Sequence, residues 1–266
     1  MGNGDGVVAH PISSLPQDFQ DAAIVQVAMD EEAAPFFELT EPAGDSFSYG
    51  IAEFFPRVVR SDQREQKVLL VRSRIGLVNA ATAITTALRL APSTPLVVSA
   101  GTAGGLHTST NVGDLVIGTE FTYTDADATA FGYARGQVPG MPEKFDAAPS
   151  LVESLSALPQ SELAPVEFTG TIHRGPMLAG GSFVTAHNVA DTRVVFPDAI
   201  STDMETTAIA QVCHNEDVPF IAVRAISDLC GPTADQVFHL EVDLVAPVSA
   251  QAALAVIDHV IAAGGH

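Results

Sequence analysis

The chain has 266 residues, and its 47% hydrophobic content is enough for the core of one large α/β domain. It carries 12 lysines and arginines against 32 aspartates and glutamates, which gives a formal net charge of -20. Because such a surface repels nucleic acid and anionic membranes, the composition excludes both classes of partner.

The N-terminal stretch 1–21 has neither a positively charged start nor an apolar segment, so it does not resemble a signal peptide. We expect it to be a disordered lead-in, followed by a single domain over residues 22–266. No uninterrupted apolar run of about 18 residues is present, so no transmembrane span is expected. The two cysteines, Cys213 and Cys230, form neither a metal motif nor a disulfide framework, which indicates reduced thiols in a cytoplasmic protein.

Short apolar runs alternate with helical patterns along the chain. Strands are predicted at 22–29, 67–72, 95–100, 114–120, 168–173, 199–202 and 218–224. Helices are predicted at 76–90, 205–214 and 243–263, the last with Pro247 in its first turn. This alternation predicts a three-layer α/β/α domain whose central sheet is mixed, mainly parallel and covered by helices on both faces. The polar stretch 125–142 is predicted to be a long functional loop.

Four polar segments follow predicted strands, at the edge where ligands collect in open α/β sheets. They are Met-Asp-Glu-Glu at 29–32, Gly-Thr-Ala-Gly-Gly at 101–105, Asp-Met-Glu at 203–205 and Ser-Asp at 227–228. Each has a purely structural alternative, namely acids at a helix N-terminus, a tight glycine turn, or helix capping by Asp203 and Asp228. The functional alternative is a cleft lined by carboxylates, in which desolvation would raise the pKa of Asp228 toward the working range.

Taken together, seven segments resemble the nucleoside phosphorylase and nucleosidase superfamily, and within it the methylthioadenosine/S-adenosylhomocysteine nucleosidases. They occur in order, with compatible spacing, from residue 23 to residue 228. The segments are 28–32, 73–76, 100–106, 112–114, 125–133, 203–214 and 218–228. Each match alone is weak, whereas seven in register are specific. The resemblance implies the superfamily's sheet and the removal of adenine from a 5'-thio-substituted adenosine.

The resemblance also implies roles for the polar residues. Glu32 would position and deprotonate the attacking water, while Asp228, with Ser227 as its hydrogen-bond partner, would protonate purine N7. Glu205 would bind the ribose hydroxyls, and Met204 and Met29 would lie against the sugar.

The remaining pocket residues follow from the same resemblance. Phe183 would stack on the base, the backbone of Val184 would contact it, and Ala103 and Gly104 would let it approach closely. The 5'-substituent pocket would contain Ile75, Ala128, Phe131 and Tyr133. Phe131 and Tyr133 would come from the neighbouring subunit of a homodimer.

The chemistry of an N-ribosidic bond agrees with this assignment. Cleavage builds positive charge on the ribose, which fixed carboxylates stabilise, and negative charge on the base, which an acid neutralises. One carboxyl must therefore be ionised and the other protonated, as in glycoside hydrolysis. We expect direct displacement by water, without a metal or cofactor, because no His/Cys/Asp cluster has metal spacing.

Two other functions remain as alternatives. A phosphate-dependent nucleoside phosphorylase would need cations for its anionic nucleophile, yet acids follow the first strand and Val98 and Ser99 precede the glycine segment. Arg74 and Arg224 remain candidates for a phosphate site, although pairing with the carboxylates is favoured for Arg224. A catalytically silent purine-nucleoside binding protein is the third alternative, against which the complete set of acids argues.

Three positions depart from the family pattern, which usually has Glu at 203, Asp at 181 and Ala at 182. Here they are Asp203, Gly181 and Ser182, and the segment 229–243 does not align. Ala128 is smaller than the usual valine. The preference among 5'-substituted adenosines therefore stays open.

Overall fold

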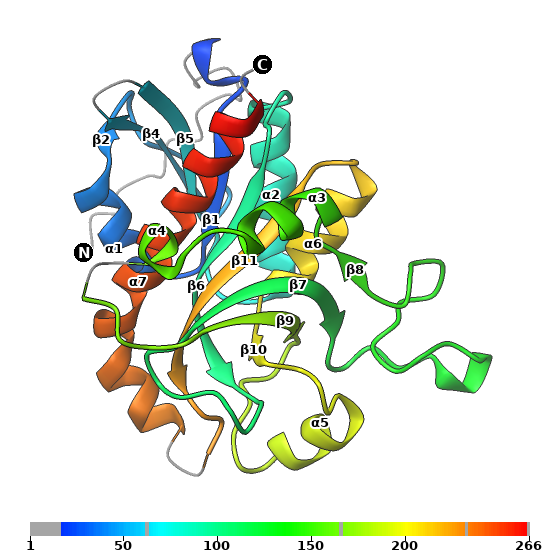
Figure 1. Cartoon of the computed structure of the whole chain (residues 1–266). Helices are drawn as coiled ribbons and strands as arrows, with labels where there is room; N and C mark the ends of the chain where they lie inside the picture. The colour runs from blue at the N-terminus through cyan, green and yellow to red at the C-terminus, as the bar shows by residue number, and fades with distance from the viewer. Residues whose placement is uncertain (1–16, 62–63, 165–166, 232–233, 265–266) are drawn as a thin grey trace, which may run out of the picture.

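An 11-stranded mixed sheet runs through the protein, with its main path in the order β10-β9-β7-β11-β6-β1-β5-β4-β2. The computed structural model in Figure 1 describes residues 17–61, 64–164, 167–231 and 234–264. The strands are β1 (Ala23–Val27), β2 (Glu41–Pro42), β3 (Phe47–Tyr49), β4 (Ala52–Ser61), β5 (Arg64–Arg72), β6 (Val97–Gly105), β7 (Leu115–Tyr123), β8 (Phe145–Asp146), β9 (Ile172–Ala179), β10 (Ser201–Asp203) and β11 (Phe220–Asp228). The helices are α1 (Asp30–Leu39), α2 (Leu77–Leu90), α3 (Pro149–Ser156), α4 (Gln160–Leu163), α5 (Val189–Val195), α6 (Thr206–Asn215) and α7 (Ala234–Gly264).

Buried side chains alternate between the two faces of the central strands. Ile24 of β1 belongs to a core cluster that includes residues of α2 and α6, whereas Val25 belongs to a cluster with residues of α1 and α7. The sheet is therefore covered on both faces, and the predicted three-layer α/β/α class with a mixed sheet is confirmed (Figure 1).

Parallel pairing is confined to part of the sheet. The neighbours β5, β1, β6 and β11 run parallel, as do β7, β9 and β10, while β4 pairs antiparallel with β5 and β7 pairs antiparallel with β11. In addition, β10 pairs with both β9 and β6, so the strands from β6 to β10 close on themselves. The sequence did not predict this closure, because the pairing of a three-residue strand depends on tertiary contacts.

The glycine-rich segment 101–105 is strand and not the predicted turn, since β6 continues through Gly105. A Cβ atom at Gly101 would lie 2.3 Å from Oε1 of Glu32, and one at Gly104 would lie 2.5 Å from Sγ of Cys230. The glycines therefore allow side chains from other elements to approach the strand closely.

Two prolines lie inside elements whose bounds differ from the predicted ones. The strand predicted at 168–173 is found as β9, which begins at Ile172 and continues through Gly175 and Pro176. Proline has no backbone N–H to donate, and Pro176 is tolerated because it lies opposite a register shift in β7, where the regular hydrogen-bond pattern is interrupted. Pro247 lies in the interior of α7 and not in its first turn, because this helix begins at Ala234.

The last helix contains a segment, Glu241–Ala262, that is long and apolar enough to cross a membrane. Glu241, Asp243 and Asp258 lie within it, so it contains no unbroken apolar run of the kind sought in the sequence. Moreover, α7 packs against β6, β11 and α1, and buries Ala250, Ala253 and Ile257 in the core. We interpret it as a helix of the protein core.

Most of the predicted lead-in, residues 1–16, lies outside the described residues. Its last residues belong to the fold, since Gln17–Phe19 form a 3-10 helix and Phe19 is buried in the core. The packed structure thus begins before Ala22, earlier than predicted.

Candidate active site

One pocket collects residues from the carboxyl ends of β1, β6, β10 and β11. Its empty volume, which includes the open mouth, is about 600 Å³, a size suited to a small molecule. The pocket is lined by Ala28, Met29, Glu32, Ile75, Thr102, Ala103, Gly104, Ser182, Phe183, Val184, Thr202, Asp203, Met204, Glu205, Ser227, Asp228 and Cys230. The structure therefore brings all four polar segments predicted from the sequence to one cavity.

Glu32 lines this pocket and is held by several hydrogen bonds, and only 2% of the residue is exposed. It occupies the third position of α1, and its Oε2 accepts hydrogen bonds from the N–H groups of Ala28 (2.9 Å) and Met29 (3.3 Å). This is the acidic half of a capping box, so the helix terminus itself fixes the carboxylate. Oε1 accepts from the N–H (2.7 Å) and the hydroxyl (3.0 Å) of Thr102.

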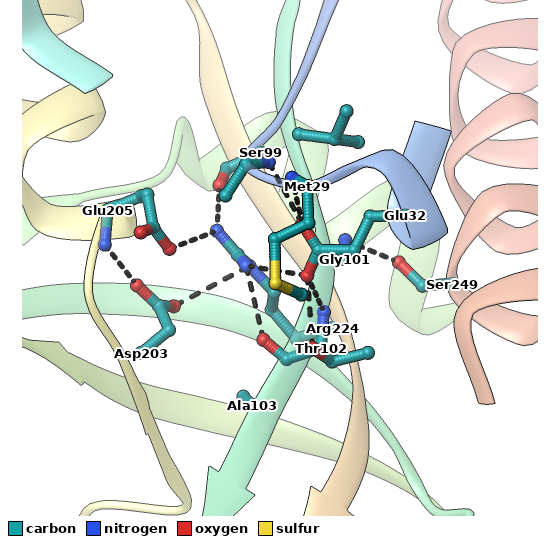
Figure 2. Close-up of polar contacts among 12 residues, drawn as sticks. Met29, Glu32, Ser99, Gly101, Thr102, Ala103, Asp203, Glu205, Arg224 and Ser249 are labelled. Carbon is teal, nitrogen blue, oxygen red and sulfur yellow. Dashed lines mark hydrogen bonds and ion pairs between the residues drawn. The ribbon is translucent and has the colours of Figure 1, made fainter. Parts of the chain in front are cut away.

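Arg224 lies at the centre of three buried carboxylates, as Figure 2 shows. Its guanidinium nitrogens are 3.9 Å from Oε1 of Glu32, 3.5 Å from Oδ2 of Asp203 and 3.8 Å from Oε2 of Glu205. It also donates a hydrogen bond to the hydroxyl of Ser99 (2.8 Å). Three acids share one cation, so acidic groups outnumber the cation in a site suited to a positively charged sugar.

Glu205 and Asp203 stand where β10 passes into α6. Oδ1 of Asp203 accepts from the N–H groups of Glu205 (2.8 Å) and Thr206 (2.7 Å), so it binds the backbone at the start of α6, although the N-cap residue itself is Glu205 and not Asp203 as predicted. Oε1 of Glu205 accepts from the N–H of Gly76 (2.8 Å). Burial, opposed by the charge of Arg224, raises the pKa of Glu205 to about 8. Asp203, which replaces the family's usual glutamate, thus has a structural role and a place in the acidic cluster.

Asp228 ends β11 on the other side of the pocket and is buried. Its Oδ1 accepts from the N–H of Cys230 (2.8 Å), and its Oδ2 accepts from the hydroxyl of Ser227 (3.1 Å). Burial raises the pKa of Asp228 above its usual range, although these hydrogen bonds oppose the shift. The proton needed for acid catalysis is therefore retained more readily than in an exposed aspartate.

The predicted base, ribose and 5'-pocket residues divide into two groups. Met29, Ile75, Ala103, Gly104, Phe183, Val184 and Met204 all line the pocket. Ala128, Phe131 and Tyr133 lie away from it in the single chain, and Phe131 is 84% exposed near the tip of the long loop. Within the described part of the chain, no group of three or more His, Cys, Asp or Glu residues could hold a metal ion.

Several residues that hold the site were not singled out by the sequence. The hydroxyl of Ser249 on α7 accepts from the N–H of Gly101 (2.8 Å) and donates to the carbonyl of Val223 (2.8 Å), so it joins helix, β6 and β11 (Figure 2). Thr102 and Ser99 bind Glu32 and Arg224 as described. Thr102 could have been noticed as the one hydroxyl in the glycine segment, whereas nothing in the sequence marks Ser249.

Comparison with known proteins assigns the class. The model of the phosphorylase superfamily matches residues 22–262, which is nearly the whole chain. The chain therefore belongs to the phosphorylase superfamily.

Individual relatives narrow this class. A 5'-methylthioadenosine/S-adenosylhomocysteine nucleosidase from Staphylococcus aureus (strain MRSA252) is 38% identical over 71% of this chain and 80% of the relative. The crystal structure of such a nucleosidase from Neisseria meningitidis, in complex with methylthio-immucillin-A, has a TM-score of 0.80 at 33% identity and covers 90% of this chain and 98% of that one. The Colwellia psychrerythraea nucleosidase in complex with adenine has a TM-score of 0.81 at 30% identity over 90% and 95% of the two chains. Within the superfamily, the chain is a member of the 5'-methylthioadenosine/S-adenosylhomocysteine nucleosidase family, as its motifs had indicated.

Proposed function

We propose that this protein hydrolyses the N-glycosidic bond of 5'-thio-substituted adenosines, such as methylthioadenosine and S-adenosylhomocysteine, and releases adenine. The observation that carries the proposal is the convergence of Glu32, Glu205 and Asp228 on one pocket. Their surroundings differ, as separate catalytic duties require. The names of the relatives, and their complexes with adenine and methylthio-immucillin-A, support the same substrate class.

In the proposed reaction, Glu32 takes a proton from a water molecule as that water attacks C1' of the ribose. Glu32 suits this duty because four hydrogen bonds from Ala28, Met29 and Thr102 fix its carboxylate beside the cavity. A base fixed in one orientation does not populate unreactive rotamers, and positioning of this kind contributes strongly to the rate of reaction. Glu205 would accept hydrogen bonds from the ribose hydroxyls, with Met204 and Met29 packed against the sugar.

Asp228 would deliver its proton to N7 of the purine as the bond between C1' and N9 breaks, so that adenine leaves as a neutral molecule. The buried position and raised pKa of Asp228 keep this proton available. Ser227 would hold Oδ2 while Phe183, Val184, Ala103 and Gly104 flank the base.

Phosphorolysis is less well supported than hydrolysis. A phosphate nucleophile would enter beside Glu32, where Glu32, Asp203 and Glu205 share the single cation Arg224. The other candidate, Arg74, forms ion pairs with Glu53 and Asp30. Both arginines are thus already opposite carboxylates, and the local charge repels an anion.

We further propose a cytoplasmic homodimer in which Phe131 and Tyr133 complete the 5'-substituent pocket of the neighbouring subunit. In the single chain they lie away from the pocket, while Ile75 at its mouth is 49% exposed and leaves room for an apolar cover. Ala128, on the same loop, would set the width of that cover.

The decisive experiment is adenine release from methylthioadenosine in phosphate-free buffer, followed with and without added phosphate. We expect full activity without phosphate and free methylthioribose as the second product. Strict dependence on phosphate would identify a phosphorylase, and tight binding without turnover would identify a silent nucleoside-binding protein.

A further inference from the structure

Four charged side chains form a cluster beside the pocket that the proposed reaction does not use. We name Asp30, Glu53, Arg72 and Arg74 the charged rim. Arg74 lies 3.1 Å from Oε2 of Glu53 and 3.9 Å from Oδ2 of Asp30, and Arg72 forms ion pairs with the same two acids. The rim therefore holds two cations and two anions in direct contact.

The register of the sheet places the rim at the edge of the pocket. Val27 of β1 is paired with Arg72 of β5, and Arg72 is paired with Glu53 of β4, so these residues form one row across three strands. Because β1 and β5 are parallel, the segments that follow Val27 and Arg72 emerge at the same edge of the sheet. Met29 and Ile75, which line the pocket, are the direct sequence neighbours of Asp30 and Arg74.

In the single chain, the lining of the pocket is exposed on this side. Ile75 is half exposed although it lines the cavity, and the side chain of Arg74 is 46% exposed. A substituent on the 5' carbon that is longer than the pocket would pass between Ile75 and the proposed apolar cover and meet the rim.

Arg74 itself adopts an unusual backbone conformation, with φ of 71°. This left-handed region favours glycine and disfavours residues with a Cβ atom. Since its half-exposed side chain contributes nothing to the apolar core, packing does not account for an arginine at this position.

We propose that the charged rim binds the α-amino acid group at the end of a 5'-substituent, and that Arg74 thereby favours S-adenosylhomocysteine over methylthioadenosine. This inference rests on the proposed function. The substrate's α-carboxylate pairs with the guanidinium of Arg74, a geometry that can form two parallel hydrogen bonds. Its ammonium group pairs with Asp30 and Glu53.

The distances within the rim indicate which ion pair separates when the substrate binds. Arg74 and Asp30 are 3.9 Å apart, at the limit of an ion pair, while Arg72 is less exposed and contacts both acids. A zwitterion can enter between Arg74 and Asp30 while Arg72 keeps the two acids in place. A methylthio group has no charge and gains nothing from the rim.

The test compares Arg74→Gly with the wild type on both substrates. Glycine suits the positive φ, so this variant removes the charge without straining the backbone. We expect the ratio of kcat/KM for S-adenosylhomocysteine to that for methylthioadenosine to fall about fivefold, as for loss of a partly exposed charge-assisted pair. Arg60→Ala is the matched control, because Arg60 also pairs with two acids, Glu41 and Glu65, but at the other end of β5.

A ratio unchanged in Arg74→Gly, or an equal fall in Arg60→Ala, overturns the role of the rim and leaves the proposed function intact. The dissociation constants of both compounds are also measured by calorimetry in the Asp228→Asn background, with and without Arg74→Gly. If the wild type hydrolyses neither compound, the proposed function fails. The ratio of the two dissociation constants then decides separately whether Arg74 recognises the amino acid group.

Discussion

Gly101→Ala tests how strictly the backbone of β6 positions the catalytic carboxylate. Gly101 has φ of 134°, and a Cβ atom there would lie 2.3, 2.5 and 2.8 Å from the three carboxyl atoms of Glu32. Ordinary contact begins near 3.4 Å, so the carboxylate must retreat by about 1 Å. A misplacement of about 1 Å can cost roughly 10²-fold in rate. We expect kcat to fall about 100-fold.

The same substitution also strains the backbone, at a cost of about 1–3 kcal/mol. Gly113→Ala separates the two effects, because Gly113 also has a positive φ (91°) but no atom lies within 4 Å of the added Cβ. Both variants are expected to show a lower Tm, while Gly101→Ala alone loses turnover. The assays are thermal unfolding and adenine release from methylthioadenosine. A Gly101→Ala enzyme with kcat within threefold of the wild type would refute the reasoning, as would an equal loss of kcat in Gly113→Ala.

The remaining predictions concern the titratable groups. Asp228→Asn should lower kcat by about 10²–10⁴-fold, and wild-type kcat should decline as the pH rises through the raised pKa of Asp228, which a pH–rate profile measures. Glu205 has a pKa of about 8 in the fold against an ordinary value of 4.5, so the native state binds more protons between these values. The free energy of unfolding should therefore decrease as the pH rises from about 5 to 8, and urea titrations of Glu205→Gln should show a weaker decrease; an identical slope would contradict this assignment. Burial raises the pKa of both thiols, that of Cys230 to about 12, so a disulfide reagent at pH 8 should label Cys213 and Cys230 only after denaturation.

The fold class could be predicted because it depends on local patterns. Apolar runs such as the one in β11 and the amphipathic pattern of α2 are readable from neighbouring residues alone. The predicted strands ended too early, before Gly101 and Pro176, because glycine and proline usually interrupt strands. Here Gly101 makes room for Glu32, which is distant in sequence, and Pro176 lies at a register shift.

The candidate site was predictable to a similar extent. The acids were visible as polar segments after strands, and the resemblance supplied their expected roles. Their supports were not visible, because Ser249 and Ser99 act through contacts with β6, β11 and Arg224 that only the tertiary structure creates. Arg224 appeared in the sequence as one charge in an apolar strand, but the number of its carboxylate partners depends on three separate elements.

Turnover of methylthioadenosine in ¹⁸O-labelled water shows whether Glu32 activates water while Asp228 releases the base from the same pocket. Under single-turnover conditions with phosphate present, we expect one ¹⁸O atom on C1 of the methylthioribose and unlabelled adenine as products. We also expect that Glu32→Gln abolishes this incorporation while still binding the substrate. A sugar 1-phosphate without ¹⁸O would show that phosphate and not water is the nucleophile, and undiminished incorporation in Glu32→Gln would show that Glu32 does not activate the water.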